Sequence, residues 1–200
     1  MWNEQIIMML LEGIKDTLYM TLTSTLIGYV IGLPMGILLT VTDKDGIHPN
    51  AAVYKVLDVI ANLIRSVPFL ILLIVLIPFT RFLIGRSYGP TATIVPLVIA
   101  AAPYIARMVE SSLKEVDAGV IEAARSMGAS NFTIVTKVML VEARTSLIVG
   151  ATISLGTILG YSAMAGTVGG GGLGDIAIRY GYTRWQTDIM IVTVDRKSVV

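Results

Sequence analysis

The sequence predicts an all-α polytopic membrane protein. Hydrophobic residues make up 54% of its 200 residues and charged residues only 14%, whereas soluble domains carry roughly a quarter charged residues. Several uncharged stretches are long enough to cross a bilayer, since a helix needs about 20 apolar residues to span a ~30 Å hydrocarbon core. Every backbone polar group must be satisfied inside lipid, and continuous apolar runs achieve this as helices rather than as a closed barrel.

The composition excludes several classes of function. A net charge of +1 does not supply the concentrated basic surface that binds nucleic acid. Cysteine is absent, which removes disulfides, thiolate chemistry and Cys-based metal sites. The single histidine, His48, lies in the polar stretch GIHPN and is interpreted as solvated, so we expect no metal site.

The first element, residues 1–16, is predicted to be an interfacial helix. It lacks the basic region and small-residue cleavage site of a secretory signal. Its apolar residues recur at helical spacing: Trp2, Ile6, Met9, Leu10 and Ile14. This pattern is typical of a helix that lies at the membrane surface and leads into a span.

A transmembrane domain is predicted over residues 17–194. Its five spans are expected at residues 17–42, 57–80, 87–107, 145–166 and 185–194. The fifth is incomplete, because its last apolar run ends where Asp195, Arg196 and Lys197 begin. We interpret residues 195–200 (DRKSVV) as a non-native tail, since they resemble a translated sequencing-adapter fragment.

Arg65 is the one charge well inside a predicted span. Intramembrane charges are costly and usually face protein or water. Asp58 lies two helical turns earlier, which disfavours a direct pair. An interhelix salt bridge, snorkelling and a role in the translocation path all stay open, and Pro68 predicts a bend nearby.

Glycines mark two helix faces and one connection. The series Gly28, Gly32 and Gly36, and the pair Gly156 and Gly160, are small-xxx-small faces that let helices approach closely. Packing within the chain is the favoured interpretation, with a dimer seam or pore wall as the alternative. The stretch TVGGGGLGD (167–175) has no phosphate-loop pattern. It is interpreted as a flexible outer connection, or alternatively as a gate or docking loop.

Residues 108–144 form a polar segment predicted to be a two-helix elbow. Asp117 can cap a helix through Met127, and Gly128 can supply the tight turn that ends it. Ser130 or Asn131 can cap a second helix through Leu140. Seven basic residues on this side against five on the other favour an outside N-terminus and a cytoplasmic elbow.

No catalytic motif or run of buried acids for an ion relay appears in the sequence. Uphill transport would therefore draw its energy from another chain. The elbow itself contains Glu-Ala-Ala, three residues and glycine, at Glu122, Ala123, Ala124 and Gly128. This motif, together with RSVPFLILL, AAPYIARMVESSL and GYSAMAGTVGGGGLG, resembles the ABC-importer permeases, and within them the permease subunits of D-/L-methionine importers.

The resemblance implies a five-span ABC-importer permease core whose cytoplasmic coupling elbow docks onto a dimer of ABC ATPase subunits. It also implies a second copy of the chain, an extracytoplasmic lipoprotein binding protein and a bacterial cytoplasmic membrane. The chain itself would be a non-catalytic transport subunit that binds no cofactor, since ATP is used by the ATPase. The translocation path or gate is sought at Arg65, Tyr161, Ser162 and Met164.

One departure from the family pattern concerns the end of the elbow. The residues after the motif, Val138 to Val141, lack the family's usual proline, which predicts a more continuous helix into the fourth span. A permease for another small amino acid and an ATP-independent carrier or channel are the alternative functions, and a non-transporting scaffold is a further one.

Overall fold

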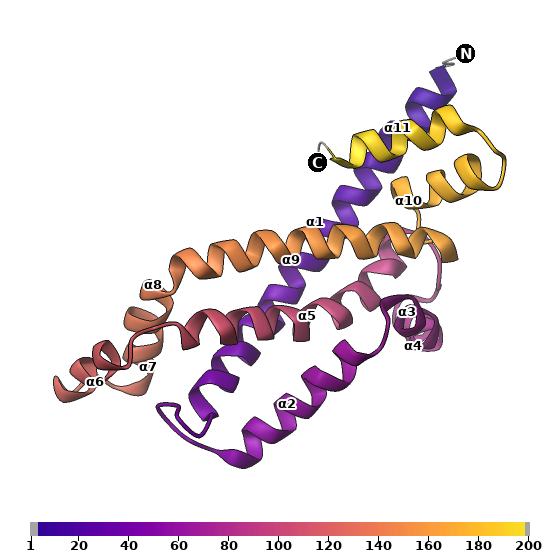
Figure 1. Cartoon of the computed structure of the whole chain (residues 1–200). Coiled ribbons are helices and arrows are strands. Elements are labelled where there is room, and N and C mark those ends of the chain that lie inside the picture. Colours follow the sequence, from indigo (N-terminus) through magenta and orange to yellow (C-terminus); the bar gives the residue numbers. More distant parts are fainter. Residues whose placement is uncertain (1–3, 199–200) are drawn as a thin grey trace. The chain divides into compact units, whose positions relative to one another are not determined.

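The computed structural model describes residues 4–198, with side chains described to Thr193, and these residues are helical apart from short turns and loops (Figure 1). The helices are α1 (Glu4–Thr42), α2 (Ala51–Ser66), α3 (Phe69–Val75), α4 (Ile77–Ile84), α5 (Pro90–Lys114), α6 (Ala118–Ser126), α7 (Asn131–Thr133), α8 (Leu140–Glu142), α9 (Arg144–Ala165), α10 (Gly172–Ile176) and α11 (Thr187–Ser198). Shorter helical turns cover Ile134–Met139, Gly166–Val168 and Ala177–Tyr182. The predicted all-α class is confirmed.

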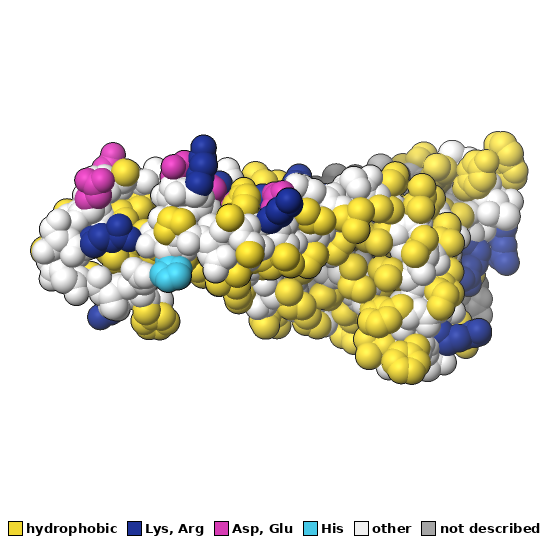
Figure 2. All heavy atoms as spheres, turned by 90° about the horizontal axis from the view of Figure 1, so that it is seen from below, with side chains coloured by type: hydrophobic (Ala, Val, Ile, Leu, Met, Phe, Trp, Pro, Cys, Tyr) yellow, Lys and Arg dark blue, Asp and Glu magenta, His cyan; other side chains and the backbone are white. Residues whose placement is uncertain are grey.

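Contacts divide the chain into two compact units. Unit 1 comprises Met1–Leu26, Pro68–Val98 and Leu155–Val200, and unit 2 comprises Ile27–Val67 and Ile99–Ser154. The visible face in Figure 2 is covered largely by hydrophobic side chains, between which the charged side chains form separate groups. Such a surface suits a chain whose outer face meets lipid.

Three helices within the described residues are long and apolar enough to cross a membrane. They are α1, α5 and the helix Arg144–Val168. They include the predicted spans 17–42 and 145–166 and all but the first three residues of 87–107. A bent pair, α2 with α3, raises the count to four if it forms one span. α11 has 12 residues, too few to cross the hydrocarbon core.

The predicted second span over residues 57–80 is interrupted in the structure, and the bend lies beside Pro68, where the sequence predicts one. α2 ends at Ser66, and Val67 is extended, with φ −84° and ψ 125°. Pro68 follows, and steric conflict with the proline ring keeps the preceding residue out of the helical region. The chain restarts as α3 and then α4, and α4 ends where Gly85 adopts a φ of +81°.

Within the described residues no break in the helix separates the predicted interfacial segment from the first span, because α1 is continuous from Glu4 to Thr42. Nothing in residues 4–33 breaks a helix, and the one proline, Pro34, is accommodated inside it. Whether residues 1–16 lie at the membrane surface stays a prediction, and Trp2 lies outside the described residues. At the other end, α11 continues through the predicted tail as far as Ser198, and residues 199–200 lie outside the described part.

In unit 1 the glycine-rich stretch forms a closely packed turn. It is not the flexible connection that the sequence predicts. A Cβ on Gly166 or Gly174 would lie 2.3 Å from backbone atoms of the facing segment. The amide of Leu173 donates to Thr17 Oγ1 of α1 over 2.9 Å. Leu173 also belongs to a core cluster with Leu10, Ile176 and Ile189, where α10 and α11 pack beside the first part of α1 (Figure 1).

In unit 2 the first glycine face packs against α5, which confirms the favoured interpretation there. A Cβ on Gly32 would lie 2.6 Å from the carbonyl oxygen of Ala102, and one on Gly36 would lie 2.5 Å from that of Ala106. Only glycine allows so close an approach of two helix backbones. By contrast, a Cβ on Gly156 or Gly160 would meet no atom within 4 Å, so this face of α9 is open within the described residues.

Candidate functional site

The first half of the elbow is a helix with a side-chain cap. Asp117 Oδ1 accepts hydrogen bonds from the amides of Gly119 (2.8 Å) and Val120 (3.3 Å). The first amides of a helix have no intrahelical acceptor, and an aspartate at the N-cap satisfies them. α6 follows over Ala118–Ser126, so the predicted cap is confirmed and the helix ends one residue earlier than expected.

The glycine of the motif ends this helix in a left-handed turn. Gly128 has a φ of +81°; its amide donates to Arg125 O (2.9 Å) and the amide of Ala129 donates to Ala124 O (3.1 Å). This pair of bonds is the Schellman arrangement, which satisfies the last carbonyls of a helix. A Cβ on Gly128 would meet nothing within 4 Å, so glycine is required by the backbone torsion and not by lack of space.

The second half of the elbow begins at Ser130, whose hydroxyl accepts from the amide of Thr133 over 3.3 Å. α7, a π-helical turn over Ile134–Met139 and α8 follow without a gap. Ala143 alone, with φ −78° and ψ 0°, separates α8 from α9. The return into the long helix is thus interrupted at a single residue, where the sequence predicts a more continuous helix.

The motif residues divide between surface and interior. Glu122, Ala123 and Gly128 are exposed, whereas Ala124 is buried against the rest of unit 2. Sequence reasoning missed two large apolar residues next to the turn, Met127 and Phe132, which are 82% and 78% exposed. The sequence signal for these two residues was the presence of large apolar side chains within a polar segment. They give the elbow an apolar surface on both sides of Gly128.

The four translocation-path candidates have different surroundings. Arg65 lies in the last turn of α2 and is exposed. Tyr161 stacks on Phe69, with ring centroids 4.5 Å apart and planes at 7°. Ser162 is buried and donates to Leu159 O over 2.8 Å, and Met164 is half exposed. Tyr161, Ser162 and Met164 share α9 in unit 1, while Arg65 belongs to unit 2.

A charge cluster in unit 2 was also missed. The buried carboxylate of Glu110 accepts from Arg107 (2.6 Å) and Lys114 (2.8 Å) on its own helix, α5. Lys114 also pairs with Asp43 (2.7 Å) after the end of α1, and Arg107 pairs with Asp58 of α2. These five residues, the Glu110 cluster, tie three helices together.

The spacing i, i+3, i+7 of Arg107, Glu110 and Lys114 was the sequence signal for this cluster, because it places all three on one face of a helix. They were instead counted as separate loop charges. The hydrogen bond from Lys114 holds the pKa of the Asp43 carboxyl below its ordinary value, while burial opposes this effect. A depressed carboxyl pKa stabilises the fold at neutral pH, and this contribution is lost as pH falls through the lowered value.

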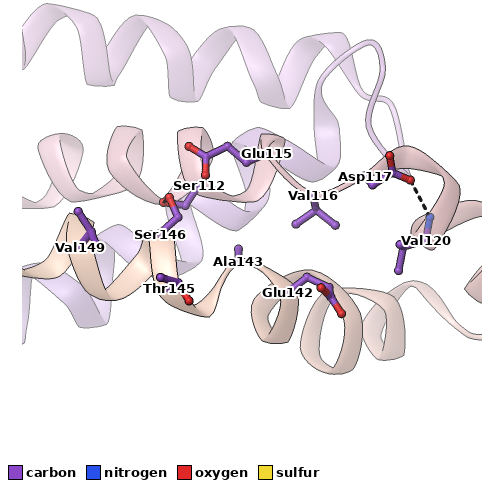
Figure 3. Close-up of a pocket in the computed structure, with 10 residues that line it drawn as sticks. All are labelled: Ser112, Glu115, Val116, Asp117, Val120, Glu142, Ala143, Thr145, Ser146 and Val149. Carbon is purple, nitrogen blue, oxygen red and sulfur yellow. Dashed lines mark hydrogen bonds between the residues drawn. The ribbon is translucent and has the colours of Figure 1, made fainter.

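Two pockets flank the elbow. One, of about 450 Å³, lies where the end of α5 meets the start of α9, and there Ser146 Oγ donates to Ser112 Oγ over 2.9 Å (Figure 3). The other, of about 490 Å³, is lined by the α1–α2 loop (residues 43–50), the end of α5, and α6. At its edge Arg125 donates to Ile47 O over 2.7 Å. No group of three or more acidic or histidine side chains in the described residues could hold a metal ion.

The family model for the binding-protein-dependent transport system inner membrane component matches residues 13–193. The chain therefore belongs to this family of membrane transport components. The matched region includes the spans, the Glu110 cluster and the whole elbow.

Curated relatives are similar over most of the chain. The "Probable D-methionine transport system permease protein MetI" of Vibrio cholerae is 48% identical over 186 residues, which cover 93% of this chain and 83% of that protein. The D-methionine transport system permease protein MetI of Escherichia coli is 51% identical, over 82% of this chain and 76% of that protein.

Solved structures agree with the fold. A chain of the inward-facing MetNI methionine ABC transporter matches with a TM-score of 0.97 and 47% identity, over 99% of this chain and 92% of that chain. A chain of an amino acid ABC transporter matches with a TM-score of 0.79 at 22% identity, a likeness of fold alone.

We predict that Gly128→Val strains the elbow, because a β-branched residue is disfavoured at positive φ. The expected cost is roughly 1–3 kcal/mol of local stability. Gly128→Asn is the matched control, since asparagine tolerates the left-handed region. Amide hydrogen exchange over residues 118–142 should be faster in the valine variant than in the asparagine variant, and equal exchange would refute the torsional role of Gly128.

We predict that Glu110→Gln destabilises unit 2 by roughly 1–3 kcal/mol, because Arg107 and Lys114 each lose a charged hydrogen-bond partner while they keep Asp58 and Asp43. The measurement is thermal unfolding of the purified protein in detergent. Asp45→Asn is the control, because the Lys44–Asp45 pair is exposed and spans 3.8 Å, and such pairs add little. Equal unfolding temperatures for Glu110→Gln and wild type would show that the Glu110 cluster does not contribute to the stability of unit 2.

Proposed function

We propose that this chain is the permease subunit of an ATP-driven importer that carries methionine inward across the bacterial cytoplasmic membrane. The observation that carries the proposal is the motif Glu122-Ala123-Ala124 closed by the Gly128 turn. The names of the relatives supply the substrate. Transport follows alternating access, in which ATP binding and hydrolysis on a partner move the permease between inward-open and outward-open states.

The elbow is the surface that the ATPase subunits contact. Its exposed side presents the carboxylate of Glu122 and the small side chain of Ala123, and Met127 and Phe132 add large exposed apolar groups beside the turn. Buried apolar anchors surrounded by polar groups are the pattern of a protein–protein contact. Ala124, on the buried side of the motif, packs α6 against the rest of unit 2. Movement at the exposed surface of α6 therefore reaches the spans.

The complex comprises two copies of this permease, a dimer of ABC ATPase subunits and an extracytoplasmic lipoprotein that delivers the substrate. The permease core has five spans, with the N-terminus outside and the elbow in the cytoplasm. The chain binds no cofactor and catalyses no reaction, because ATP is used by the ATPase. The open face of α9 at Gly156 and Gly160 is available for contact with the second copy.

The translocation path is proposed to run past α9, with Tyr161, Ser162 and Met164 as candidate contacts and Arg65 as a candidate gate residue. The Phe69–Tyr161 stack places an aromatic surface next to the break at Pro68, where a change in helix direction is least costly. Another small amino acid as substrate is the alternative function; an ATP-independent carrier is a weaker one, because it has no use for the elbow.

We predict that uptake of labelled methionine into proteoliposomes requires the full-length permease, its ATPase, ATP and the binding protein. Removal of any one component should abolish uptake, because the energy and the substrate arrive through different partners. A proton or sodium gradient without ATP serves as the control. Uptake driven by such a gradient alone would show that the protein is a secondary carrier. ATP-dependent uptake of a different amino acid, without uptake of methionine, would contradict the proposed substrate but not the proposed mechanism.

We predict that Glu122→Lys weakens ATPase binding by roughly tenfold, because it reverses the charge at the centre of the contact. Membrane insertion and dimer formation should remain normal. The measurement is recovery of the ATPase on affinity-purified permease. Glu142→Lys reverses another exposed acid of the same segment and should bind like wild type; equal losses in both variants would mean that the effect is one of net charge.

A further inference from the structure

We propose that the α1–α2 loop (residues 43–50) is a second arm of the coupling device and that Arg125 is the positioning residue that joins it to α6. The inference rests on the proposed function, because it concerns how movement of the elbow reaches the spans. α6 is continuous along the chain only with α5 and, through α7 and α8, with α9. The bond from Arg125 to Ile47 O (2.7 Å) adds a path to α1 and α2.

The loop is folded tightly enough to transmit a displacement. Its backbone turns back on the end of α1 through bonds from His48 N to Val41 O (3.0 Å) and from Asn50 N to Thr42 O (2.9 Å). A Cβ on Gly46 would lie 2.4 Å from Val41 O, so the loop backbone lies directly on the helix end. A segment bonded in this way moves with the helix that it covers.

Both helices that flank the loop are fixed to the same end of α5. On one side Asp43 pairs with Lys114, and on the other Arg107 binds Asp58 and also donates to Asn62 over 3.0 Å. The Asn50 side chain accepts from Val53 N (3.2 Å) and caps the start of α2. The loop is therefore the rigid link between α1 and α2, and Arg125 is its bond to the motif helix.

A measurement of protein stability would not distinguish this role of Arg125 from that of an ordinary surface contact. A single bond from an exposed arginine contributes little to folding, because solvent competes for both partners. The discriminating quantity is the amount of substrate moved for each ATP hydrolysed, since a broken link leaves the ATPase bound while its movement is transmitted less fully.

The experiment compares Arg125→Ala with wild type in proteoliposomes that contain the ATPase and the binding protein. Methionine transported per ATP hydrolysed should fall clearly below the wild-type ratio, because less of the movement of α6 reaches the loop when the bond is lost. Arg125→Lys should recover most of the ratio, because the contact uses a single donor and needs no planar fork. Lys44→Ala is the control, since its side chain is 85% exposed and pairs with Asp45 of the same loop. An unchanged ratio in Arg125→Ala overturns the inference.

A second measurement needs no partner protein. Amide hydrogen exchange of residues 43–50 in the isolated permease should be several-fold faster in Arg125→Ala than in wild type, and Lys44→Ala should resemble wild type. Equal exchange in Arg125→Ala and wild type would show that the bond does not hold the loop, which also overturns the inference. Failure of the proposed function is recognised separately, because in that case wild type itself shows no ATP-dependent uptake.

Discussion

The carboxylate of Glu110 is the interaction on which the arrangement of unit 2 depends. It is buried, with its side chain 7% exposed, and it lies between two cations of its own helix. Burying a lone carboxylate is costly, and two neighbouring cations offset this cost. Arg107 and Lys114 each keep further N–H donors that Glu110 does not use. Those donors reach Asp43 and Asp58, so a single buried acid determines where the end of α1 and the middle of α2 lie against α5.

The elbow is attached to this fixed end of α5. Its own geometry comes from local rules: an aspartate cap at Asp117, a Schellman turn at Gly128 and a serine cap at Ser130. These caps stabilise short helices that would not persist alone, since isolated helices below about 12–15 residues are marginal in water. The elbow thus combines a rigid base with an exposed surface, as a part that passes movement between two proteins requires.

Local signals in the sequence predicted the long helices and the elbow. Uncharged runs predicted α1, α5 and α9, and the caps at Asp117 and Ser130 together with Gly128 predicted the elbow's two halves within one or two residues. Residues that act over long sequence separations were not predictable in the same way. The Glu110 cluster joins residues as far apart as Asp43 and Lys114, and a single sequence does not show which distant charges meet.

Composition alone does not show how closely two segments pack. The glycine-rich connection was expected to be flexible, yet close backbone contact orders it. The bend beside Pro68, by contrast, follows from the proline and is present at Val67. The same limit applies to the path candidates. Tyr161 and Ser162 were chosen because they lie in the motif GYSAMAGTVGGGGLG. The structure adds the stack of Tyr161 on Phe69.

The central claim is that the exposed side of the elbow is the surface covered by the ATPase. The most direct test uses the absence of cysteine from these 200 residues, which makes an introduced cysteine their only thiol. Met127→Cys replaces a side chain that is 82% exposed and should react with a maleimide in the isolated permease but be protected once the ATPase is bound. Tyr88→Cys, at a position 66% exposed in unit 1, should react equally in both states. Full reactivity of Met127→Cys in the purified complex would contradict the account.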